Sequence, residues 1–415
     1  MWKQPWGYIE GWTICGGILI TGIILQFFLG KISPETFHSP VNLIFGAVFL
    51  FLLLLFYLIS KKIKVFQWFS GYAAAVTSIS SLLLLVIIMG LTRQTSSSLD
   101  LSQGNIFDRI GFMQMTVSWQ FVLLFLYFLW ILGLVILKRL SRFKWKDTGF
   151  ILNHLGLFIA LFAAFWGSSD LQRLRMTASL NTPEWRATDE KNEMVELPLA
   201  IELKSFTIDE YPPKLMLLDN TTGEALPKKQ PQNVSVETSP FTAKLMDWDL
   251  EITHYLPSAA AVYNSDTVNF TAFNDEGATA ALYVKASNRI DKTGKEGWVS
   301  CGSYVFPYSS LRLNEKVSLI MPEREPKHFA SDIAVYTQNG DSGTVKKAVV
   351  EVNKPFSIAG WKIYQLSYDE AMGKWSQHSV FELVKDPWLP AVYLGMGLMI
   401  AGAIFLFISA PKKSI

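Results

Sequence analysis

Long uncharged apolar runs alternate with polar stretches along this chain. Six of the runs reach the roughly 20 residues that a helix needs to cross the apolar core of a bilayer, and they cover 12–30, 41–60, 71–91, 117–137, 148–167 and 388–409. The third is the weakest, because "AAAVTSISS" precedes its apolar half, and small or hydroxyl residues favour a helix packed closely on its neighbours. The pattern predicts a polytopic α-helical membrane protein with six spans.

The basic residues predict the orientation of these spans, because short cytoplasmic loops carry an excess of Lys and Arg. "KKIK" at 61–64, "KRLSRFKWK" at 138–146 and the C-terminal "PKKS" are basic, whereas the loops 31–40 and 92–116 hold little positive charge. Six spans with both termini in the cytoplasm satisfy every loop. The region 168–387 is then external, which means periplasmic for a protein of the bacterial inner membrane.

The external region is predicted to be a β-rich, sandwich-like domain. From Val195 to Leu203 apolar residues alternate with polar or small ones, which is the period of a half-buried strand. The parity flips after Ser205, which predicts a bulge. The same alternation recurs from Met246 to Ile252, and "AVYTQNGDSGTVKKAVVEV" at 334–352 predicts a hairpin. The mixed-charge stretch 168–195 is interpreted as a surface connection leaving the fifth span.

Composition excludes several classes of function. The net charge of +2 is too small to indicate nucleic-acid binding. The two cysteines, Cys15 in the first apolar run and Cys301 in the polar region, are not expected to form a disulfide, and the sequence contains no CxxC motif for thiol–disulfide chemistry. The first run lacks a small-residue cleavage site and is interpreted as a retained span.

Four of the five histidines have no metal-binding pattern around them. His38, His328 and His378 lie among polar residues and are predicted to be on the surface, while His254 is in phase with the apolar face of its strand and is predicted to be a core residue. The sequence shows neither HxxxH nor HxH spacing, and it contains no GxSxG motif, phosphate loop or paired-carboxylate motif. A conventional soluble active site is therefore not predicted.

His154 differs from the other histidines because it lies inside an apolar run. A helix beginning near Thr148 places it about six residues, or ~9 Å, into the membrane from the cytoplasmic face. Ionisable residues within spans face the bundle interior or a cavity and are functional candidates by default, and a neutral imidazole is a good ligand for haem iron. The residues alone leave two interpretations open: a haem ligand or proton relay, and an interfacial histidine hydrogen-bonded to a neighbouring helix.

The C-terminal part of the external region is rich in aromatic residues. "EVNKPFSIAGWKIYQLSYDE" at 351–370 predicts a short strand, a turn and a second strand that leads towards the last span. From the residues alone, four aromatic side chains near this junction form a candidate membrane-interface belt, namely Trp361, Tyr364, Tyr368 and Trp388.

The same stretch resembles a signature of the ResB/CcsB family, the accessory subunit of System II cytochrome c synthase. "VNKPFSIAGWKIYQLSYD" resembles the family's "VN-P…-G-…-YQ-SYD", and "DPWLPAVYLGMGLMIAG" after it resembles the start of the family's last span. "NHLGLFIALFAAFWG" resembles the "HLGL…G" span before the external domain, "MTVSWQFVLLFLYFLWILGLVILKRL" at 115–140 resembles the span before that one, and "YAAAVTSISSLLLLVIIMGLT" at 72–92 is a looser match to the family's first span. The resemblance covers roughly 66–415 in the family's order.

The resemblance implies a function and a site. It implies a membrane subunit that receives haem b, conducts it across the membrane and supports its thioether attachment to the CxxCH motif of apocytochrome c. The haem is transiently bound substrate, and the partner is a ResC/CcsA-like subunit with a "WWD" segment, which this chain lacks. The match of "HLGL" assigns the axial iron ligand to His154. The chain would be part of a lyase-type complex, and it is not expected to be catalytic alone.

The resemblance also divides the chain into four parts: an extra two-span hairpin at 1–65, a three-span ResB-like region at 66–167, the periplasmic domain at 168–387, and the last span with its tail at 388–415. The usual four-span pattern lacks the hairpin, and the sequence predicts that its deletion spares haem binding. Two other functions stay open, namely an exporter of haem or another small molecule without ligation activity, and an anchored scaffold or sensor.

Overall fold

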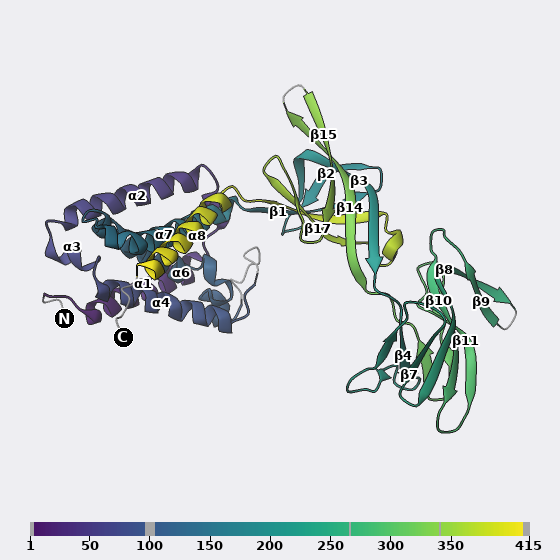
Figure 1. Ribbon diagram of the computed structural model, residues 1–415. Helices are drawn as coiled ribbons and strands as arrows, with labels where there is room; N and C mark the ends of the chain where they lie inside the picture. The colour runs from purple at the N-terminus through teal and green to yellow at the C-terminus, as the bar shows by residue number, and fades with distance from the viewer. Residues whose placement is uncertain (1–3, 96–103, 265–266, 340–341, 410–415) are drawn as a thin grey trace. The chain divides into compact units, whose positions relative to one another are not determined.

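The computed structural model describes residues 4–95, 104–264, 267–339 and 342–409, which divide into two compact units (Figure 1). The first, the helical unit, comprises Met1–Gln172 and Lys385–Ile415, and the second, the β unit, comprises Arg173–Val384. The β unit is thus an insertion between the last two long helices of the helical unit. Each unit is described by itself below.

Six helices of the described chain are long and apolar enough to cross a membrane. They are α1 (Tyr8–Leu29), α2 (Val41–Ser60), α4 (Tyr72–Leu91), α6 (Trp119–Leu140), α7 (Thr148–Gly167) and α8 (Leu389–Ile408). The short helices α3 (Lys64–Trp68) and α5 (Ile106–Arg109) lie in the connections. The six predicted spans are confirmed as helices, and their length and composition indicate a multi-pass membrane protein.

Helices α7 and α8 approach each other through glycines. A Cβ atom placed on Gly156 would lie 2.5 Å from the Gly395 carbonyl oxygen, and one on Gly402 would lie 2.7 Å from the Asn153 amide nitrogen. Gly149, Asn153 and Gly156 recur at spacings of four and three along α7, which places them on one face of the helix. Small residues allow such close backbone contact, which is a common basis of helix association in membranes.

The N-terminal helices are integral to the helical unit. In α1, Gly22 packs directly on the backbone of Gln120 in α6, and a Cβ atom there would lie 2.3 Å from the Gln120 Cα. In α2, Leu53 and Tyr57 are buried in one apolar cluster with Phe158 of α7 and four residues of α6. The helices within residues 1–65 therefore contribute to the same bundle as α6 and α7.

The β unit contains eighteen strands in the described part of the chain. Their bounds are β1 (Gln172–Ser179), β2 (Pro183–Thr188), β3 (Met194–Glu210), β4 (Lys214–Asp219), β5 (Ala225–Leu226), β6 (Asn233–Ser235), β7 (Phe241–Leu245), β8 (Trp248–Asn264), β9 (Thr267–Ala272), β10 (Thr279–Asn288), β11 (Gly294–Ser300), β12 (Leu311–Arg312), β13 (Val317–Ile320), β14 (Pro326–Asn339), β15 (Ser342–Glu351), β16 (Phe356–Ile358), β17 (Trp361–Tyr368) and β18 (His378–Lys385). The predicted β-rich region is confirmed.

One eight-stranded sheet has the order β15-β14-β3-β2-β1-β18-β17-β16. Its buried residues form a single apolar cluster that includes Val350 near one edge and Ile358 and Trp361 near the other. The strands β15 and β17 also contact each other. The sheet therefore curves around its own core.

Two five-stranded sheets share a second core. Their orders are β11-β10-β8-β7, with β9 beside β8, and β12-β13-β4-β5, with β6 beside β4. Leu215 and Leu319 from one sheet and Leu250 and Leu282 from the other are buried in the same cluster. This part of the β unit is a sandwich of two sheets with an apolar core separate from that of the eight-stranded sheet.

Several local predictions are confirmed. The parity change after Ser205 arises from a bulge, because Ser205 pairs with Asp332 whereas Leu203 pairs with Ile333 and leaves Lys204 as the extra residue. The predicted hairpin is β14 and β15, whose last described pair is Asn339 with Ser342. The two residues of its turn lie outside the described residues.

Three local predictions are wrong. The stretch 168–195 is not a surface connection, because β1 and β2 within it belong to the eight-stranded sheet. Met246 lies in the turn between β7 and β8, with a φ of 49°, and is exposed. Trp361 is only 3% exposed and packs in the core of the eight-stranded sheet, so it is not part of a membrane-interface belt.

Candidate functional site

His154 lies in the first half of α7 and is half-buried. Its Nδ1 atom is 2.9 Å from the carbonyl oxygen of Phe150, one turn earlier on the helix. A carbonyl can only accept a hydrogen bond, so Nδ1 carries the proton in this arrangement and Nε2 carries the lone pair. No hydrogen bond to Nε2 is found within the described part of the chain. This tautomer is the one that an Nε2 metal ligand requires.

An aromatic contact fixes the plane of the same imidazole. The Phe150 ring lies 3.7 Å from the His154 ring, with an angle of 22° between the two planes. On α6, the Arg139 guanidinium lies 4.9 Å from the centre of the Phe150 ring and donates to Asp147 at 3.1 Å. The imidazole, the phenyl ring and the guanidinium thus form one continuous set of contacts, which we call the His154 stack.

Asn153 has a different role from His154. With its amide oriented to suit its neighbours, Asn153 donates to the Met399 carbonyl oxygen and accepts from the Ala403 amide, both at 3.3 Å. Both partners belong to α8. Asn153 therefore joins α7 to α8, whereas its neighbour His154 has a ring nitrogen without a hydrogen bond among the described residues.

The other four histidines are exposed. His328 lies 3.3 Å from Glu351 and His378 lies 3.0 Å from Ser179, as expected for surface residues. The prediction that His254 is a core residue is wrong. Tyr283 pairs with His254 but Val284 pairs with Ile252, so a bulge at Thr253 turns His254 to the outer face.

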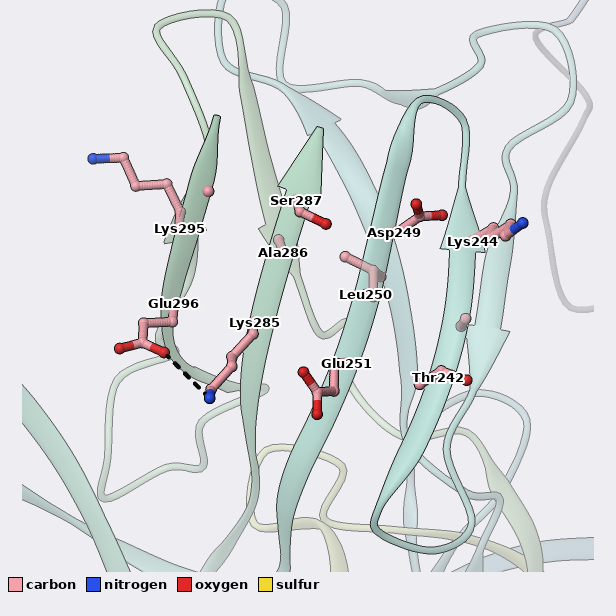
Figure 2. Close-up of a pocket in the computed structure, with 12 residues that line it drawn as sticks. Thr242, Lys244, Asp249, Leu250, Glu251, Lys285, Ala286, Ser287, Lys295 and Glu296 are labelled. Carbon is pink, nitrogen blue, oxygen red and sulfur yellow. Dashed lines mark ion pairs between the residues drawn. The ribbon is translucent and has the colours of Figure 1, made fainter. Parts of the chain in front are cut away.

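Two of the hollows in the described part of the β unit are large, and neither shows a recognisable catalytic arrangement of side chains. One, of about 690 Å³, lies on the face formed by β7, β8, β10 and β11, where Figure 2 shows charged side chains of both signs on neighbouring strands. The other, of about 710 Å³, is lined by the loop from Cys301 to Tyr308 and the segment from Tyr368 to Trp375. Burial lowers the pKa of the Lys374 ammonium in this second hollow.

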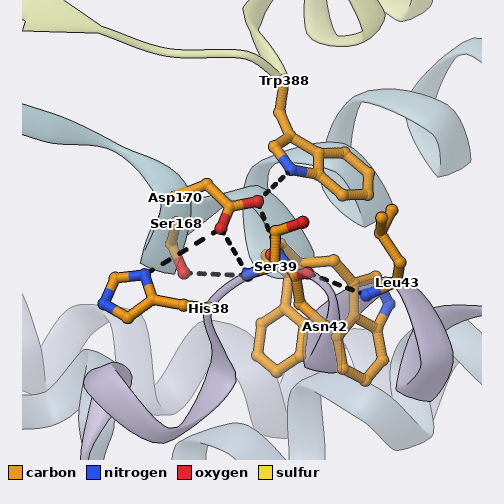
Figure 3. A network of polar contacts seen from close by, with 9 residues as sticks. His38, Ser39, Asn42, Leu43, Ser168, Asp170 and Trp388 are labelled. Carbon is orange, nitrogen blue, oxygen red and sulfur yellow. Dashed lines mark hydrogen bonds and ion pairs between the residues drawn. The ribbon is translucent and has the colours of Figure 1, made fainter. Parts of the chain in front are cut away.

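A carboxylate at the far end of α7 connects three segments of the helical unit (Figure 3). Asp170 accepts hydrogen bonds from the Ser39 amide at 2.8 Å, the Asn42 side chain at 2.7 Å and the Trp388 indole at 2.7 Å. His38 lies 3.9 Å from the same carboxylate. We call this arrangement the Asp170 junction. Sequence reasoning did not identify it, because the donors lie 128, 131 and 218 positions from Asp170 along the chain.

Both cysteines are free thiols, as predicted, with Cys15 buried in the helical unit. Within the described ranges, no group of three or more His, Cys, Asp or Glu side chains could hold a metal ion. Of the five histidines that sequence analysis considered, His154 alone is half-buried, and the other four are exposed. The residues that sequence analysis missed are its neighbours Phe150 and Arg139, which sequence spacing alone did not connect to it.

Residues 284–378 match the family model described as the ResB-like family. The chain carries a ResB-like segment. This segment includes the motif at 351–370, so the match confirms the resemblance first suggested by that motif. The ResB-like segment begins in β10 and ends at the first residue of β18, so it lies wholly in the β unit. His154 lies outside it.

No curated protein matches the chain. The chain is similar to a solved structure titled "Cytochrome c Heme Lyase CcmF", with 12% identity and a TM-score of 0.21, over 89% of this chain and 46% of that chain. The chain thus spans about half the length of that structure's chain.

Proposed function

We propose that this chain is the ResB-type membrane subunit of a cytochrome c synthase. It receives haem b at the cytoplasmic side, conducts it across the inner membrane and supports its attachment to apocytochrome c together with a WWD-bearing ResC/CcsA-like subunit. The match of residues 284–378 to the ResB-like family supports a role in cytochrome c biogenesis. The proposed orientation places both termini in the cytoplasm and the β unit in the periplasm, as the basic loops favour.

The observation that carries the haem assignment is the free Nε2 of His154. In this apolar helix the Nδ1 of His154 lies 2.9 Å from the Phe150 carbonyl, which leaves the Nε2 lone pair for a ligand. The described residues offer no comparable imidazole, because the other four histidines are exposed. His154 would supply one axial ligand to the iron, and the partner subunit would supply the other.

The chemistry of attachment requires little of this chain. Haem brings the vinyl groups and the substrate brings the two thiols of its CxxCH motif, so the synthase has to hold and orient them. His154 would hold the iron, and the chain continues from α7 through Asp170 into the first strand of the β unit.

The test is haem binding by the complex of this chain with its partner. The purified wild-type complex should show a Soret band, and His154→Gly should lose most of it. Added imidazole should restore the band in His154→Gly, because a free imidazole can occupy the vacated ligand position. His38→Ala, an exposed histidine of the same unit, is the control and should keep the wild-type spectrum.

Two outcomes would contradict the proposal in different ways. A His154→Gly complex with unchanged haem content would remove the ligand assignment. A wild-type complex that binds haem but never attaches it to a CxxCH substrate would favour the exporter function instead.

A further inference from the structure

The cation of the His154 stack is available to a ligand. Arg139 lies in the last turn of α6, and its guanidinium covers the Phe150 ring that packs on His154. Asp147 holds this guanidinium through one hydrogen bond of 3.1 Å. A guanidinium has five N–H donors. The Arg139 side chain is 45% exposed, and the described residues show no further hydrogen bond from it.

The ion pair with Asp147 positions the Arg139 guanidinium but leaves most of its hydrogen-bond donors unused. The Asp147 side chain is largely buried, at 13% exposure, and Asp147 is the N-cap residue of α7, three residues before Phe150. The carboxylate thus holds the guanidinium beside the start of α7, while the remaining donors make no hydrogen bond to a described residue. Arginine is well suited to bind a carboxylate through two parallel hydrogen bonds.

Haem bound at His154 would bring two propionate carboxylates to this part of the bundle. An unpaired carboxylate at the edge of a bilayer core is costly, so a haem site in a membrane requires a nearby cation. Arg139 is linked to His154 through one aromatic ring, with contacts of 4.9 Å and 3.7 Å. The chemistry needed at the edge of the porphyrin is therefore present beside the proposed iron ligand.

We propose that Arg139 binds a propionate of the haem whose iron His154 ligates, and thereby orients the porphyrin within the bundle. This inference rests on the proposed function. A membrane-spanning protein offers a second source of anionic oxygens at this depth, the phosphate of a lipid headgroup. The experiment must distinguish a propionate from that phosphate.

The test compares haem with its dimethyl ester, in which both propionates are neutral. The full chain is placed in lipid nanodiscs, with empty discs as the blank, and both affinities are measured for wild type, Arg139→Gln and Arg142→Gln. Arg142 is the matched control, because it follows α6 by two residues and is exposed, and its side chain makes no hydrogen bond or ion pair with a described residue. We expect Arg139→Gln to weaken haem about 10- to 100-fold, the range for hydrogen bonds to a charged group, and to leave the ester unchanged.

Wild-type protein should also bind the ester more weakly than haem, by about the factor that Arg139→Gln produces. The Soret maximum of bound haem should stay the same in Arg139→Gln, since the iron ligand is intact. Arg139→Lys should show an intermediate loss of haem affinity, because lysine keeps the positive charge but cannot form the two parallel hydrogen bonds of a guanidinium.

An equal loss for haem and ester in Arg139→Gln, or the same loss in Arg142→Gln, would assign Arg139 to folding or to lipid headgroups and overturn the proposal. Unchanged haem affinity in Arg139→Gln would also overturn the proposal for Arg139. If His154→Gly still lost haem affinity in that case, the proposed function would remain supported. Unchanged affinity in His154→Gly would overturn both.

Discussion

The Asp170 side chain accepts three hydrogen bonds from segments that are far apart in the chain. Its carboxylate is 10% exposed, and Asn42, which donates to it, is completely buried. A buried carboxylate with three donors satisfies polar groups that would otherwise lie unpaired at the edge of an apolar bundle. The junction therefore contributes to stability through its hydrogen bonds, largely independently of the exposed His38.

Replacing Asp170 with alanine should destabilise the helical unit by about 3 kcal/mol. The change removes the acceptor of the Ser39 amide and the Trp388 indole and one of the two acceptors of the Asn42 side chain. Losing a hydrogen bond to a charged group costs about 1.5–3 kcal/mol. Reversible unfolding in mixed micelles of increasing SDS fraction would measure the change.

His38→Ala is the control for this variant, since His38 is 52% exposed and lies 3.9 Å from the carboxylate. An exposed ion pair of this kind contributes less than about 1 kcal/mol. Equal destabilisation by the two variants would contradict the assignment of stability to the three hydrogen bonds.

Some residues of functional or structural importance can be identified from the sequence alone, and others cannot. His154 could be selected because an imidazole in an apolar run is unusual whatever surrounds it. Asp170 could not, because "SSD" after a span is an ordinary surface sequence and its donors lie more than 120 positions away. Arg139 was counted among the basic residues that orient the spans, and its contact with Phe150 depends on how α6 and α7 pack.

At the scale of elements, the α7–α8 contact depends on glycines that have no room for a side chain. Gly156→Ala should destabilise the protein by about 1–3 kcal/mol, because the new Cβ would lie 2.5 Å from a backbone oxygen of Gly395 and the helices must separate. A thermal unfolding midpoint in detergent would measure the loss.

Gly397→Ala is the matched control on α8, since a Cβ atom there meets nothing within 4 Å. It should leave the midpoint unchanged or raise it slightly, because alanine has the higher helix propensity. A lower midpoint for Gly397→Ala than for Gly156→Ala would exclude close packing as the reason for the glycines.

A second element-scale prediction concerns β3 and β14. Hydrogen bonds from Lys204, at 2.5 Å, and from Tyr336 lower the pKa of Glu202 below its ordinary value of 4.5. A carboxyl with a lowered pKa in the folded state stabilises the fold above pH 4.5, and this contribution is lost as the pH falls through the folded-state pKa. Glu202→Gln should therefore be less stable at pH 7 and should lose less stability than wild type on acidification.

Denaturant unfolding at pH 7 and at about pH 3, followed by tryptophan fluorescence, would check this difference. Glu296→Gln is the control, because its carboxylate is exposed and its ion pair with Lys285 is 4.0 Å long. The same acid dependence in wild type and Glu202→Gln would show that Glu202 does not contribute.

The sequence predicts the helices more accurately than the strands, and the reasons are physical. Each long apolar run corresponds to a helix, because the length needed to cross a bilayer leaves little freedom. The strands β1 and β2 were missed because their buried residues, such as Leu174, Met176 and Ala178, alternate with charged ones inside a stretch that is polar on average. His254 was misplaced by a bulge, which a strict period of two cannot anticipate.

At the scale of the whole molecule, the packing of the N-terminal hairpin changes what its deletion should do. The sequence alone predicts that a chain without residues 1–65 keeps haem binding. In the structure, α1 lies against α4 and α6, and α2 lies against α6 and α7. The hairpin also supplies Leu53 and Tyr57 to the core that contains Phe158.

We therefore expect a chain lacking residues 1–65 to lose its folded helical unit and, with it, haem binding. Size-exclusion chromatography in detergent should show aggregation of the truncated chain. Supplying 1–65 as a separate polypeptide in the same cells should restore a monodisperse protein, because the missing core residues then return. A truncated chain that folds well and binds haem would instead support the sequence prediction that deleting residues 1–65 spares haem binding.

The insertion of the β unit also has a consequence for biosynthesis. The glycine face of α7 finds its partner in α8, yet residues 173–384 lie between the two helices along the chain. At a synthesis rate of about 5–20 residues per second, α7 is complete roughly 10–40 s before the ribosome reaches α8. During that interval Gly149, Asn153 and Gly156 have no helix to cover them. The nascent protein thus passes through a stage in which an assembly factor, or the partner subunit, can reach the face that α8 later covers.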